Sequence, residues 1–394
     1  MKRVLVIPSW YPSPERPLIG TFFQEQSRLS RSRYDTRVLV LRRRLLGRRR
    51  LQHWLRGRYF GPRVTAAEHL CDEEGLPVTN VDIELSSHRD SFNAATSQAE
   101  AALALDTLDR IGWTPDIVHC HCAISAGVLG RYIAATRGLP LIVSEHQHII
   151  FDYFDPEHWK AAKEVYAQAV RVAAVSEFQR QILLMNGIAA NPVVIGNYVD
   201  EQLFALASDN VVSDRIKLLF VGLASPLKDY ETFFNSLACL KRRRNTKLQV
   251  KIICADTAEH RASIETQALE HSSAAAQIEV TAGADRKHVV DLLHWSNMLV
   301  STSVAETFGI AVCEALMCGR PVVTTASGGI SDFVTHGSNG FVARIGDAES
   351  IAQRILDIVD GKLTSSPLEI RNSVVRAYGR EAFLDKLTKL YEGA

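Results

Sequence analysis

The sequence predicts an α/β protein with two tandem domains, each built on a doubly wound parallel sheet. Three observations lead to this prediction. Short β-branched runs alternate with longer segments of helical periodicity, which is the pattern of successive βαβ units. This alternation occurs in two series, and the polar, aperiodic segment 199–214 separates them. The chain of 394 residues is also long for a single domain.

The first domain is expected to span residues 1–198. Its strands are predicted at the short apolar runs Val4–Ile7, Arg37–Val40, Ile117–His119, Leu141–Val143, Val172–Val175 and Val193–Ile195. Longer segments with helical spacing lie between the later strands, at Ala94–Ile111 and Ala123–Thr136.

The second domain is expected to span residues 199–375. Its strands are predicted at Ile216–Val221, Val250–Cys254, Gln277–Thr281, Met298–Ser301, Pro321–Thr324 and Phe341–Arg344. Its helices are predicted near Tyr230–Lys241, Arg286–Ser296, Phe308–Cys318 and Ala348–Asp360. The remaining tail, about 376–394, contains the amphipathic stretch Arg380–Leu390, which we expect to pack back on the first domain. Because ligands of such sheets bind at the carboxyl ends of the strands, we expect a cleft between the two domains.

Composition excludes several classes of protein. An apolar content of 46% and a charged content of 23% are typical of a soluble globular protein, and a net charge of +1 gives no general attraction to nucleic acid. The N-terminal apolar run is too short for a signal peptide, and no apolar run reaches the roughly 18 residues of a membrane span. The seven cysteines lack CxxC spacing, which favours buried thiols in a reducing compartment. The expected location is the cytoplasm.

Two carboxylates bracket the stretch ETFGIAVCE, which runs from Glu306 to Glu314. The stretch follows a predicted strand, so Thr307, Phe308 and Gly309 should open a helix whose first amides lack partners and attract an anion. Carboxylates accept hydrogen bonds from hydroxyl groups, so an anion site beside two glutamates suits a nucleotide sugar. The alternative is an acid near the N-cap of the helix together with a solvated helix residue.

Three further loops follow predicted strands. Gly222 to Lys228 lies where phosphates bind in doubly wound folds, and Lys228 could neutralise a diphosphate. Taken singly, Lys228 is more simply interpreted as a surface lysine. Gly328 and Gly329 offer a tight turn with exposed amides. Gly20 lies in a glycine loop after the first strand.

The whole pattern resembles a retaining glycosyltransferase of family 4, of the bacterial polysaccharide or lipopolysaccharide type, with the GT-B fold of two Rossmann-like domains facing across a cleft. The resemblance covers essentially the full length. It rests on VLVIPSWYPSPERPLIGTFF, PDIVHCH, VSEH, VAAVSEFQRQIL, VIGNYVD, the Glu-x7-Glu pair and SGGISDFVTHGSNGFV, which occur in this order.

The resemblance implies roles for individual residues. Glu306 resembles the acid that contacts hydroxyls of the donor sugar, and Glu314 resembles the acid that holds the ribose. Lys228 and Gly20 match residues near the diphosphate. The amides around Phe308, Gly309 and Ile310 would face the sugar and the diphosphate. His146 matches a histidine that faces donor or acceptor, although it could instead hydrogen-bond a strand end. Where the family pattern usually has arginine after Gly222, this chain has Leu223.

The resemblance also implies the chemistry. A sugar, typically a hexose, would move from a UDP- or GDP-sugar to a hydroxyl of a glycan or lipid-linked acceptor in polysaccharide, lipopolysaccharide or exopolysaccharide biosynthesis, with retention of anomeric configuration. The chain contains no Asp-x-Asp sequence, so we expect no metal and no cofactor beyond the donor. His119 and His121 are expected to be structural.

The stretch 41–60 contains the densest positive charge, and within it Leu51, Trp54, Leu55 and Tyr59 share helical spacing. Arginines over Arg42–Arg63 beside such a helix suit the inner face of an anionic cytoplasmic membrane, which would make the protein peripheral. Two alternatives are nucleic acid, which the overall charge disfavours, and a solvated segment paired with Glu68, Asp72, Glu73 and Glu74.

Other functions on the same fold are a nucleotide-sugar epimerase, a phosphorylase, and a nucleotide-sugar-binding protein without turnover. Because Leu223 replaces the usual arginine, the hypothesis of a binding protein without turnover remains, whereas no phosphorylase signature is evident. Glycoside hydrolysis is the least favoured, because it needs two carboxylates that face each other across the scissile bond.

Overall fold

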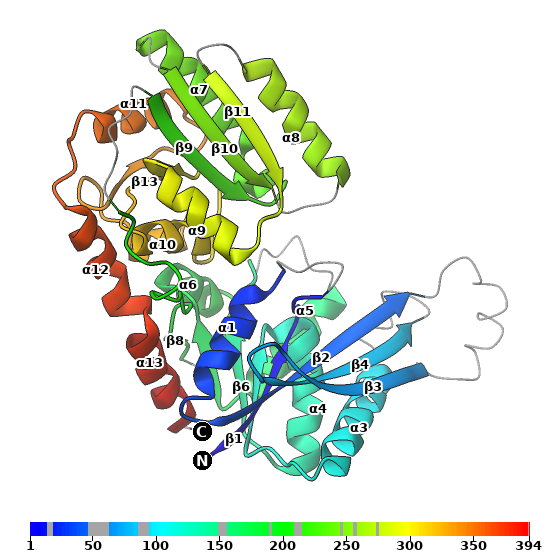
Figure 1. Ribbon diagram of the computed structural model, residues 1–394. Helices are drawn as coiled ribbons and strands as arrows, with labels where there is room; N and C mark the ends of the chain where they lie inside the picture. Colours follow the sequence, from blue (N-terminus) through cyan, green and yellow to red (C-terminus); the bar gives the residue numbers. More distant parts are fainter. Residues whose placement is uncertain are drawn as a thin grey trace. The chain divides into compact units, whose positions relative to one another are not determined.

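The computed structural model describes residues 1–13, 19–45, 63–85, 94–148, 156–188, 191–208, 215–244, 247–254, 258–272, 276–392 and 394. The chain divides into two compact units (Figure 1). Unit 1 comprises Met1–Gly196 and Leu384–Ala394, and unit 2 comprises Asn197–Phe383. From the sequence these two divisions are predicted at 198/199 and near 376.

Unit 1 contains an eight-stranded sheet with strand order β3-β4-β2-β1-β5-β6-β7-β8. Its strands are parallel, except that β3 runs antiparallel to β4. The central strands β1 and β5 are buried along almost their whole length, as expected for a sheet covered on both faces. The strands are β1 (Arg3–Pro8), β2 (Asp35–Leu45), β3 (Arg63–Cys71), β4 (Pro77–Leu85), β5 (Ile117–His121), β6 (Leu141–Glu145), β7 (Arg171–Ala174) and β8 (Val193–Val194).

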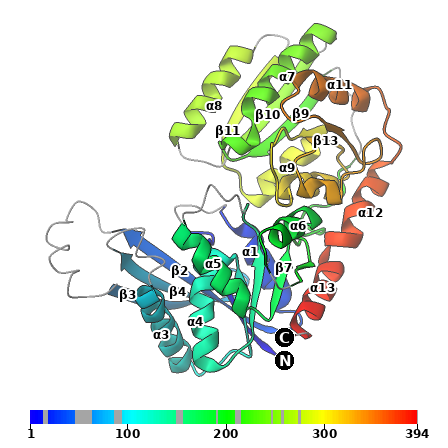
Figure 2. The same cartoon turned by 180° about the vertical axis from the view of Figure 1, so that it is seen from behind.

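Helices cover both faces of this sheet. The helix α1 lies in front of the sheet in Figure 1, whereas α4 and α5 lie in front in the reverse view of Figure 2. The face toward α4 and α5 carries the apolar core, to which Leu5, Val118 and Leu129 belong. The helices of unit 1 are α1 (Thr21–Ser30), α3 (Ala94–Arg110), α4 (Val128–Arg137), α5 (Pro156–Gln168) and α6 (Glu177–Met185), with the helical turn Ala123–Gly127 before α4.

Unit 2 contains a six-stranded, wholly parallel sheet with strand order β11-β10-β9-β12-β13-β14. Its order reverses direction after β11, so β9 and β12, which are distant in sequence, are neighbours. Such a switch of strand order is where ligands approach the carboxyl ends of parallel strands. The strands are β9 (Arg215–Gly222), β10 (Lys247–Cys254), β11 (Ala276–Ala282), β12 (Met298–Val300), β13 (Val322–Thr325) and β14 (Gly340–Ala343).

The sheet of unit 2 also has helices on both faces. Alternate residues such as Leu218 and Ile252 pack with α7, α8 and α11 in one core, whereas α9 brings Trp295 over the opposite face. The helices are α7 (Tyr230–Arg243), α8 (Ala258–His271), α9 (Arg286–Trp295), α10 (Ile310–Met317), α11 (Ala348–Val359) and α12 (Pro367–Tyr378), with a short 3-10 turn at Pro226–Lys228 and another at Gly329–Asp332.

The C-terminal helix α13 (Arg380–Glu392) contributes its residues from Leu384 onward to unit 1. There the carbonyl of Tyr391 accepts a hydrogen bond from Lys2 at 3.2 Å, and Arg33 pairs with Asp385 at 2.9 Å. The rings of Tyr34 and Tyr391 meet edge to face, with centroids 4.9 Å apart. The end of the chain is therefore part of the N-terminal unit.

All predicted strands are present, but β3, β4 and the helices α1, α5, α6, α8 and α12 were not predicted. The missed β3 is an edge strand whose residues Glu68, His69 and Leu70 are exposed, so it lacks the apolar alternation that marks a half-buried strand. The fold class predicted from the sequence, two parallel-sheet α/β domains, is confirmed.

The arginine-rich stretch begins in a strand. Arg42, Arg43 and Arg44 belong to β2, and Arg43 forms a bidentate ion pair with the buried Glu100 of α3. The helical spacing at Leu51–Tyr59 lies outside the described residues. The alternative interpretation pairs the arginines of this stretch with four nearby acids. Within the described residues it is wrong for two of them, because Asp72 and Glu74 both pair with Arg28 of α1.

Candidate active site

Unit 2 brings two of the predicted loops together by backbone pairing. The amide of Glu306 donates to the carbonyl of Ser327 at 2.7 Å, and the amide of Gly329 donates to the carbonyl of Glu306 at 2.9 Å. Glu306 and Gly328 thus form a parallel bridge between the loop after β12 and the loop after β13. The first glutamate and the Gly-Gly turn, predicted from separate motifs, lie side by side because β12 and β13 are neighbours.

The carboxylate of Glu306 is ion-paired with Lys228, the lysine predicted to face a diphosphate. Its Oε1 accepts hydrogen bonds from Lys228 Nζ and from Ser303 Oγ, the latter at 2.8 Å. Its Oε2 has no donor among the described residues. The Glu306 side chain is 13% exposed, so one oxygen is held in place and the other can accept a hydrogen bond from a ligand.

The helix α10 begins immediately after Gly309. Gly309 has φ +92°, and a Cβ added there would approach Ile330 to 2.6 Å, so only glycine fits this position. The amides of Phe308, Gly309 and Ile310 have no acceptor in the described part of the chain, and the helix dipole favours an anion near them. The ring of Phe308 packs instead on Phe333, so only its backbone belongs to the site.

Glu314 is buried, with 3% of its surface exposed, and is therefore not the solvated helix residue of the alternative interpretation. It forms an ion pair with Arg286, the first residue of α9. The guanidinium of Arg286 also lies 4.7 Å from the centroid of Phe204. A buried carboxylate is costly without a partner, and Arg286 supplies that partner while fixing the orientation of Glu314.

The loop after β9 carries Gly222 and Leu223. The carbonyl of Gly222 accepts a hydrogen bond from Tyr230 at 3.0 Å, and the stem of Lys228 packs against Gly222. Leu223 is 41% exposed. An apolar side chain therefore points outward where the resembled family has a cation, which leaves Lys228 as the charged residue of this loop.

In unit 1, Gly20 precedes α1 with φ +81°, and an added Cβ would lie 2.8 Å from the carbonyl oxygen of Trp10. The next residues place aromatic rings against the predicted histidine. Phe22 and Phe23 lie with their ring centroids 5.5 and 4.8 Å from that of His146. Two predicted residues that are far apart in sequence, Gly20 and His146, are thus joined through two phenylalanines.

His146 belongs to a buried histidine cluster. Its Nε2 is hydrogen-bonded to Nδ1 of His121 at 2.9 Å, whereas its own Nδ1 is buried and has no partner among the described residues. His119 bonds Ser144 at 2.8 Å and Tyr391 at 2.7 Å. His119 is therefore structural, as expected, but His121 contacts the predicted ligand-facing histidine directly.

Burial keeps these imidazoles neutral. It lowers the pKa of His119 and of His146 to about 3, and it lowers the pKa of His121 well below its usual value of 6.5. In the unfolded chain each histidine would titrate near that usual value. Below pH 6.5 the unfolded state therefore binds protons that the folded state does not bind. The contribution of these histidines to the free energy of unfolding is fully present above about pH 6.5 and is lost progressively toward pH 3.

We expect the free energy of unfolding to fall by about 1.4 kcal/mol per pH unit for each of these histidines once the pH is well below 6.5. Urea titrations at pH 7.5, 6.5, 5.5 and 5.0 measure this slope. His146→Asn should reduce the slope by the contribution of one histidine, about 1.4 kcal/mol per pH unit, relative to the wild type. Equal slopes for the two proteins would show that His146 is protonated in the folded state.

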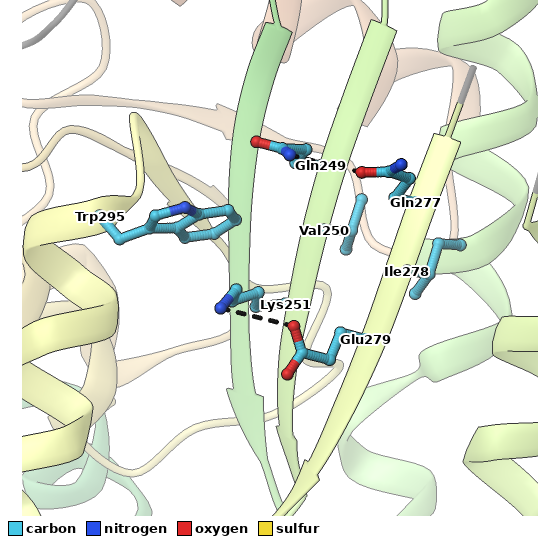
Figure 3. Close-up of a pocket in the computed structure, with 7 residues that line it drawn as sticks. All are labelled: Gln249, Val250, Lys251, Gln277, Ile278, Glu279 and Trp295. Atoms are coloured by element: carbon cyan, nitrogen blue, oxygen red, sulfur yellow. Dashed lines mark hydrogen bonds and ion pairs between the residues drawn. The ribbon is translucent and has the colours of Figure 1, made fainter. Parts of the chain in front are cut away.

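A separate hollow lies beside Trp295, on the face of β10 and β11 opposite the apolar core of unit 2 (Figure 3). There Lys251 of β10 pairs with Glu279 of β11 at 3.4 Å, and its Nζ lies 5.0 Å from the Trp295 ring centroid. None of the predicted site residues lines this hollow. The pair Lys251–Glu279 is therefore a matched control for the pair Lys228–Glu306.

In unit 2 the sequence did not predict Arg286, Ser303 or Thr302, whose hydroxyl donates to the carbonyl of Lys228 at 2.9 Å. In unit 1 it did not predict a site role for His121. Arg286 carried a detectable signal, because it is a cation at the start of a predicted helix after β11. The serine and threonine hydroxyls gave none, since their importance depends on the neighbours that the fold gives them.

Comparison with known proteins agrees with this fold. The profile for glycosyl transferases group 1 matches residues 204–377, and the profile for glycosyltransferase family 4 matches residues 65–203. The fold and the two profile matches therefore define a GT-B glycosyltransferase. The chain belongs to glycosyltransferase family 4.

Individual relatives are distant. The chain is 26% identical over 303 residues to D-inositol 3-phosphate glycosyltransferase 1 of Catenulispora acidiphila. This match covers 71% of this chain and 72% of that protein. The Anabaena Alr3699/HepE structure in complex with UDP and glucose has a TM-score of 0.74 at 15% identity and covers all of both chains. Sucrose-phosphate synthase from Thermosynechococcus elongatus has a TM-score of 0.76 at 16% identity, covering 100% of this chain and 98% of the other.

Proposed function

We propose that this glycosyltransferase is a retaining, metal-independent hexosyltransferase that moves a sugar from a nucleotide sugar to a hydroxyl of a glycan or lipid-linked acceptor. The observation that carries the proposal is the Lys228–Glu306 pair beside the unpaired amides before α10. A cation, a set of fixed donors and a carboxylate with one free oxygen match a diphosphate and the sugar attached to it.

The proposed mechanism follows from charge. Cleavage of the bond between the sugar and the diphosphate leaves negative charge on the phosphate and positive charge on the anomeric carbon. Lys228 and the amides of Phe308, Gly309 and Ile310 would stabilise the leaving diphosphate without reorganisation. Glu306 Oε2 would accept a hydrogen bond from a hydroxyl of the sugar, and Glu314, oriented by Arg286, would hold the ribose.

The roles of the remaining residues follow the same proposal. Gly222, Gly328 and Gly329 would let the donor approach the backbone at the ends of β9 and β13, and Gly20 would do so in unit 1. His146 would present its unpaired Nδ1 to the substrate. In this scheme the helix amides and Lys228 take the place that a metal ion has in other transferases, and no cofactor other than the donor is needed.

The test is a panel of UDP-, GDP- and ADP-sugars, measured first for thermal stabilisation and then for sugar transfer in the presence of a chelator. We expect one nucleotide class to raise the melting temperature and its sugar to be transferred with retained anomeric configuration, as read by NMR. Absence of stabilisation by every donor would contradict the proposal. Transfer that the chelator abolishes would contradict the metal-independent mechanism.

One observation favours a second candidate, a nucleotide-sugar-binding protein without turnover. The exposed Leu223 stands where the family pattern usually has arginine, which removes one cation from the loop after β9. Stabilisation by a nucleotide sugar, with neither transfer nor hydrolysis over many hours and acceptors, would favour this candidate over the enzyme.

The acceptor proposal includes a peripheral position on the inner face of an anionic cytoplasmic membrane. Among the residues that the structure describes, no helix has the length and apolar character needed to cross a bilayer. The stretch that would contact the membrane, Arg48–Tyr59, lies outside the described residues. Arg43 is already bound to Glu100 and Ser125, so the arginines after β2 would carry the contact.

We expect co-sedimentation with anionic but not with neutral vesicles, falling steeply as salt rises. Each arginine near such a surface contributes about 1 kcal/mol, screened within a Debye length of about 8 Å at physiological salt. Changing Arg48, Arg49 and Arg50 to Gln should reduce binding and slow transfer to a lipid-linked acceptor. The matched control changes Arg242, Arg243 and Arg244, whose charges pair with Glu349 and Asp360. Equal loss in both variants, or no binding by the wild type at low salt, would overturn the membrane proposal.

A further inference from the structure

Three consecutive residues after β12 tie together the two loops that carry the proposed lysine and glutamate. The hydroxyl of Thr302 donates to the carbonyls of Lys228 and Asp229, at 2.9 and 2.8 Å. The amide of Val304 donates to the carbonyl of Leu227 at 2.9 Å. The hydroxyl of Ser303 lies 2.8 Å from Glu306 Oε1. Thr302 thus contacts the lysine loop, and Ser303 contacts the glutamate.

The turn that Thr302 holds has an unfavourable backbone. Asp229 has φ +48° and ψ +60°, a left-handed conformation that residues with a Cβ rarely adopt. Its side chain caps α7 by accepting from the amide of Thr232 at 3.1 Å. Because Lys228 precedes this residue directly, the position of its ammonium depends on the strained turn. The buried Thr302 hydroxyl bonds the carbonyls on both sides of the strained position.

Ser303 acts on the other partner. It is buried, and its own carbonyl accepts a hydrogen bond from Thr325 of β13, so its position is held by the neighbouring strand. Its hydroxyl and Lys228 Nζ both bond Oε1 of Glu306. Two donors on one oxygen define the rotation of the carboxylate and leave Oε2 as the oxygen for a ligand.

We infer that Thr302 and Ser303 are positioning residues for the transfer reaction: Thr302 places Lys228 against the diphosphate, and Ser303 orients Glu306 toward the sugar. This inference rests on the proposed function and deepens it, because each hydroxyl serves a different part of the donor. Loss of the Thr302 hydroxyl should therefore weaken binding of the diphosphate, and loss of the Ser303 hydroxyl should weaken binding of the sugar.

The experiment uses the full chain and the donor found by the panel, together with its free nucleoside diphosphate as a second probe. Ser303→Ala should weaken binding of the nucleotide sugar about fivefold and leave the nucleoside diphosphate unchanged, because only the sugar contacts Glu306. Thr302→Val should weaken both probes by a similar factor, and Thr302→Ser, which keeps the hydroxyl, should restore binding. Ser236→Ala is the matched control, since it removes a buried hydroxyl that bonds a helix carbonyl in the core of unit 2.

A double-variant cycle separates positioning from a general loss of stability. Asp229→Gly removes the side-chain cap of α7 but relieves the left-handed conformation, and glycine is itself tolerated as an N-cap residue. The affinity lost through Thr302→Val should therefore be smaller in that background than in the wild type. Additive effects, or losses of affinity equal to those of Ser236→Ala, would overturn this inference without contradicting the proposed function. If the wild type binds no nucleotide sugar, the proposed function itself fails, which is a distinguishable result.

Discussion

Glu306→Gln is expected to lower kcat/KM for sugar transfer about 100-fold while leaving the fold intact. The substitution keeps the size of the side chain and replaces the carboxylate by an amide. A hydrogen bond to a charged group contributes about 1.5–3 kcal/mol, and about 1.4 kcal/mol corresponds to a tenfold change in rate. The amide loses both the charge that pairs with Lys228 and the charged acceptor that we propose for the sugar hydroxyl.

The measurement is steady-state transfer with the preferred donor, accompanied by the melting temperature of the free protein. Glu279→Gln serves as the control, because it neutralises a carboxylate that is also paired with a lysine of unit 2 but lies in the hollow of Figure 3. Turnover of the Glu306 variant at the rate of the control would remove Glu306 from the mechanism.

Lys228→Ala is expected to have an effect of about 100- to 1,000-fold on kcat/KM, divided between weaker donor binding and slower transfer. Removal of one preorganised donor to a developing negative charge typically costs this much. The effect should be large here because Leu223 supplies no second cation in the same loop. The loss of binding affinity should be larger for the nucleotide sugar and the nucleoside diphosphate than for a nucleoside without phosphates.

Titrations with the nucleoside, the nucleoside diphosphate and the nucleotide sugar measure this difference directly. Lys251→Ala removes the lysine of the Lys251–Glu279 ion pair and should leave all three affinities unchanged. The double variant of Lys228→Ala with Glu306→Gln should lose less than the sum of the single losses, because the two side chains contact each other. An unchanged diphosphate affinity in Lys228→Ala would assign the phosphate site to other groups.

The positions of the predicted strands and the fold class could be obtained from the sequence because they depend on local patterns. Parallel strands buried on both faces produce short apolar runs, and these runs are visible without knowledge of neighbours. The same holds for Glu306 and Glu314, whose spacing places them before and within one helix that begins after Gly309. The edge strand β3 was missed because its exposed residues carry no such pattern.

Local patterns do not determine what surrounds a side chain. Phe308 was predicted to contribute its backbone amide to the site, and the structure shows that its ring is buried and packs on Phe333 in unit 2. Arg43 was predicted among membrane-facing or solvated arginines, but it forms an ion pair with a buried glutamate of α3. The sequence shows that a residue is charged or aromatic, whereas its surroundings depend on elements far along the chain.

The sequence by itself determined the alternation of strands and helices, the two-domain organisation and the pair of glutamates, because periodicity and glycine positions are local properties. Only the tertiary structure decided which partners these residues have. Lys228 meets Glu306 across 78 residues because β9 and β12 are neighbours in the sheet, and Arg286 meets Glu314 across 28 residues. His119 meets Tyr391 across 272 residues because the end of the chain packs within unit 1. Strand order and chain crossings set these contacts, and neither is encoded in the pattern of any single segment.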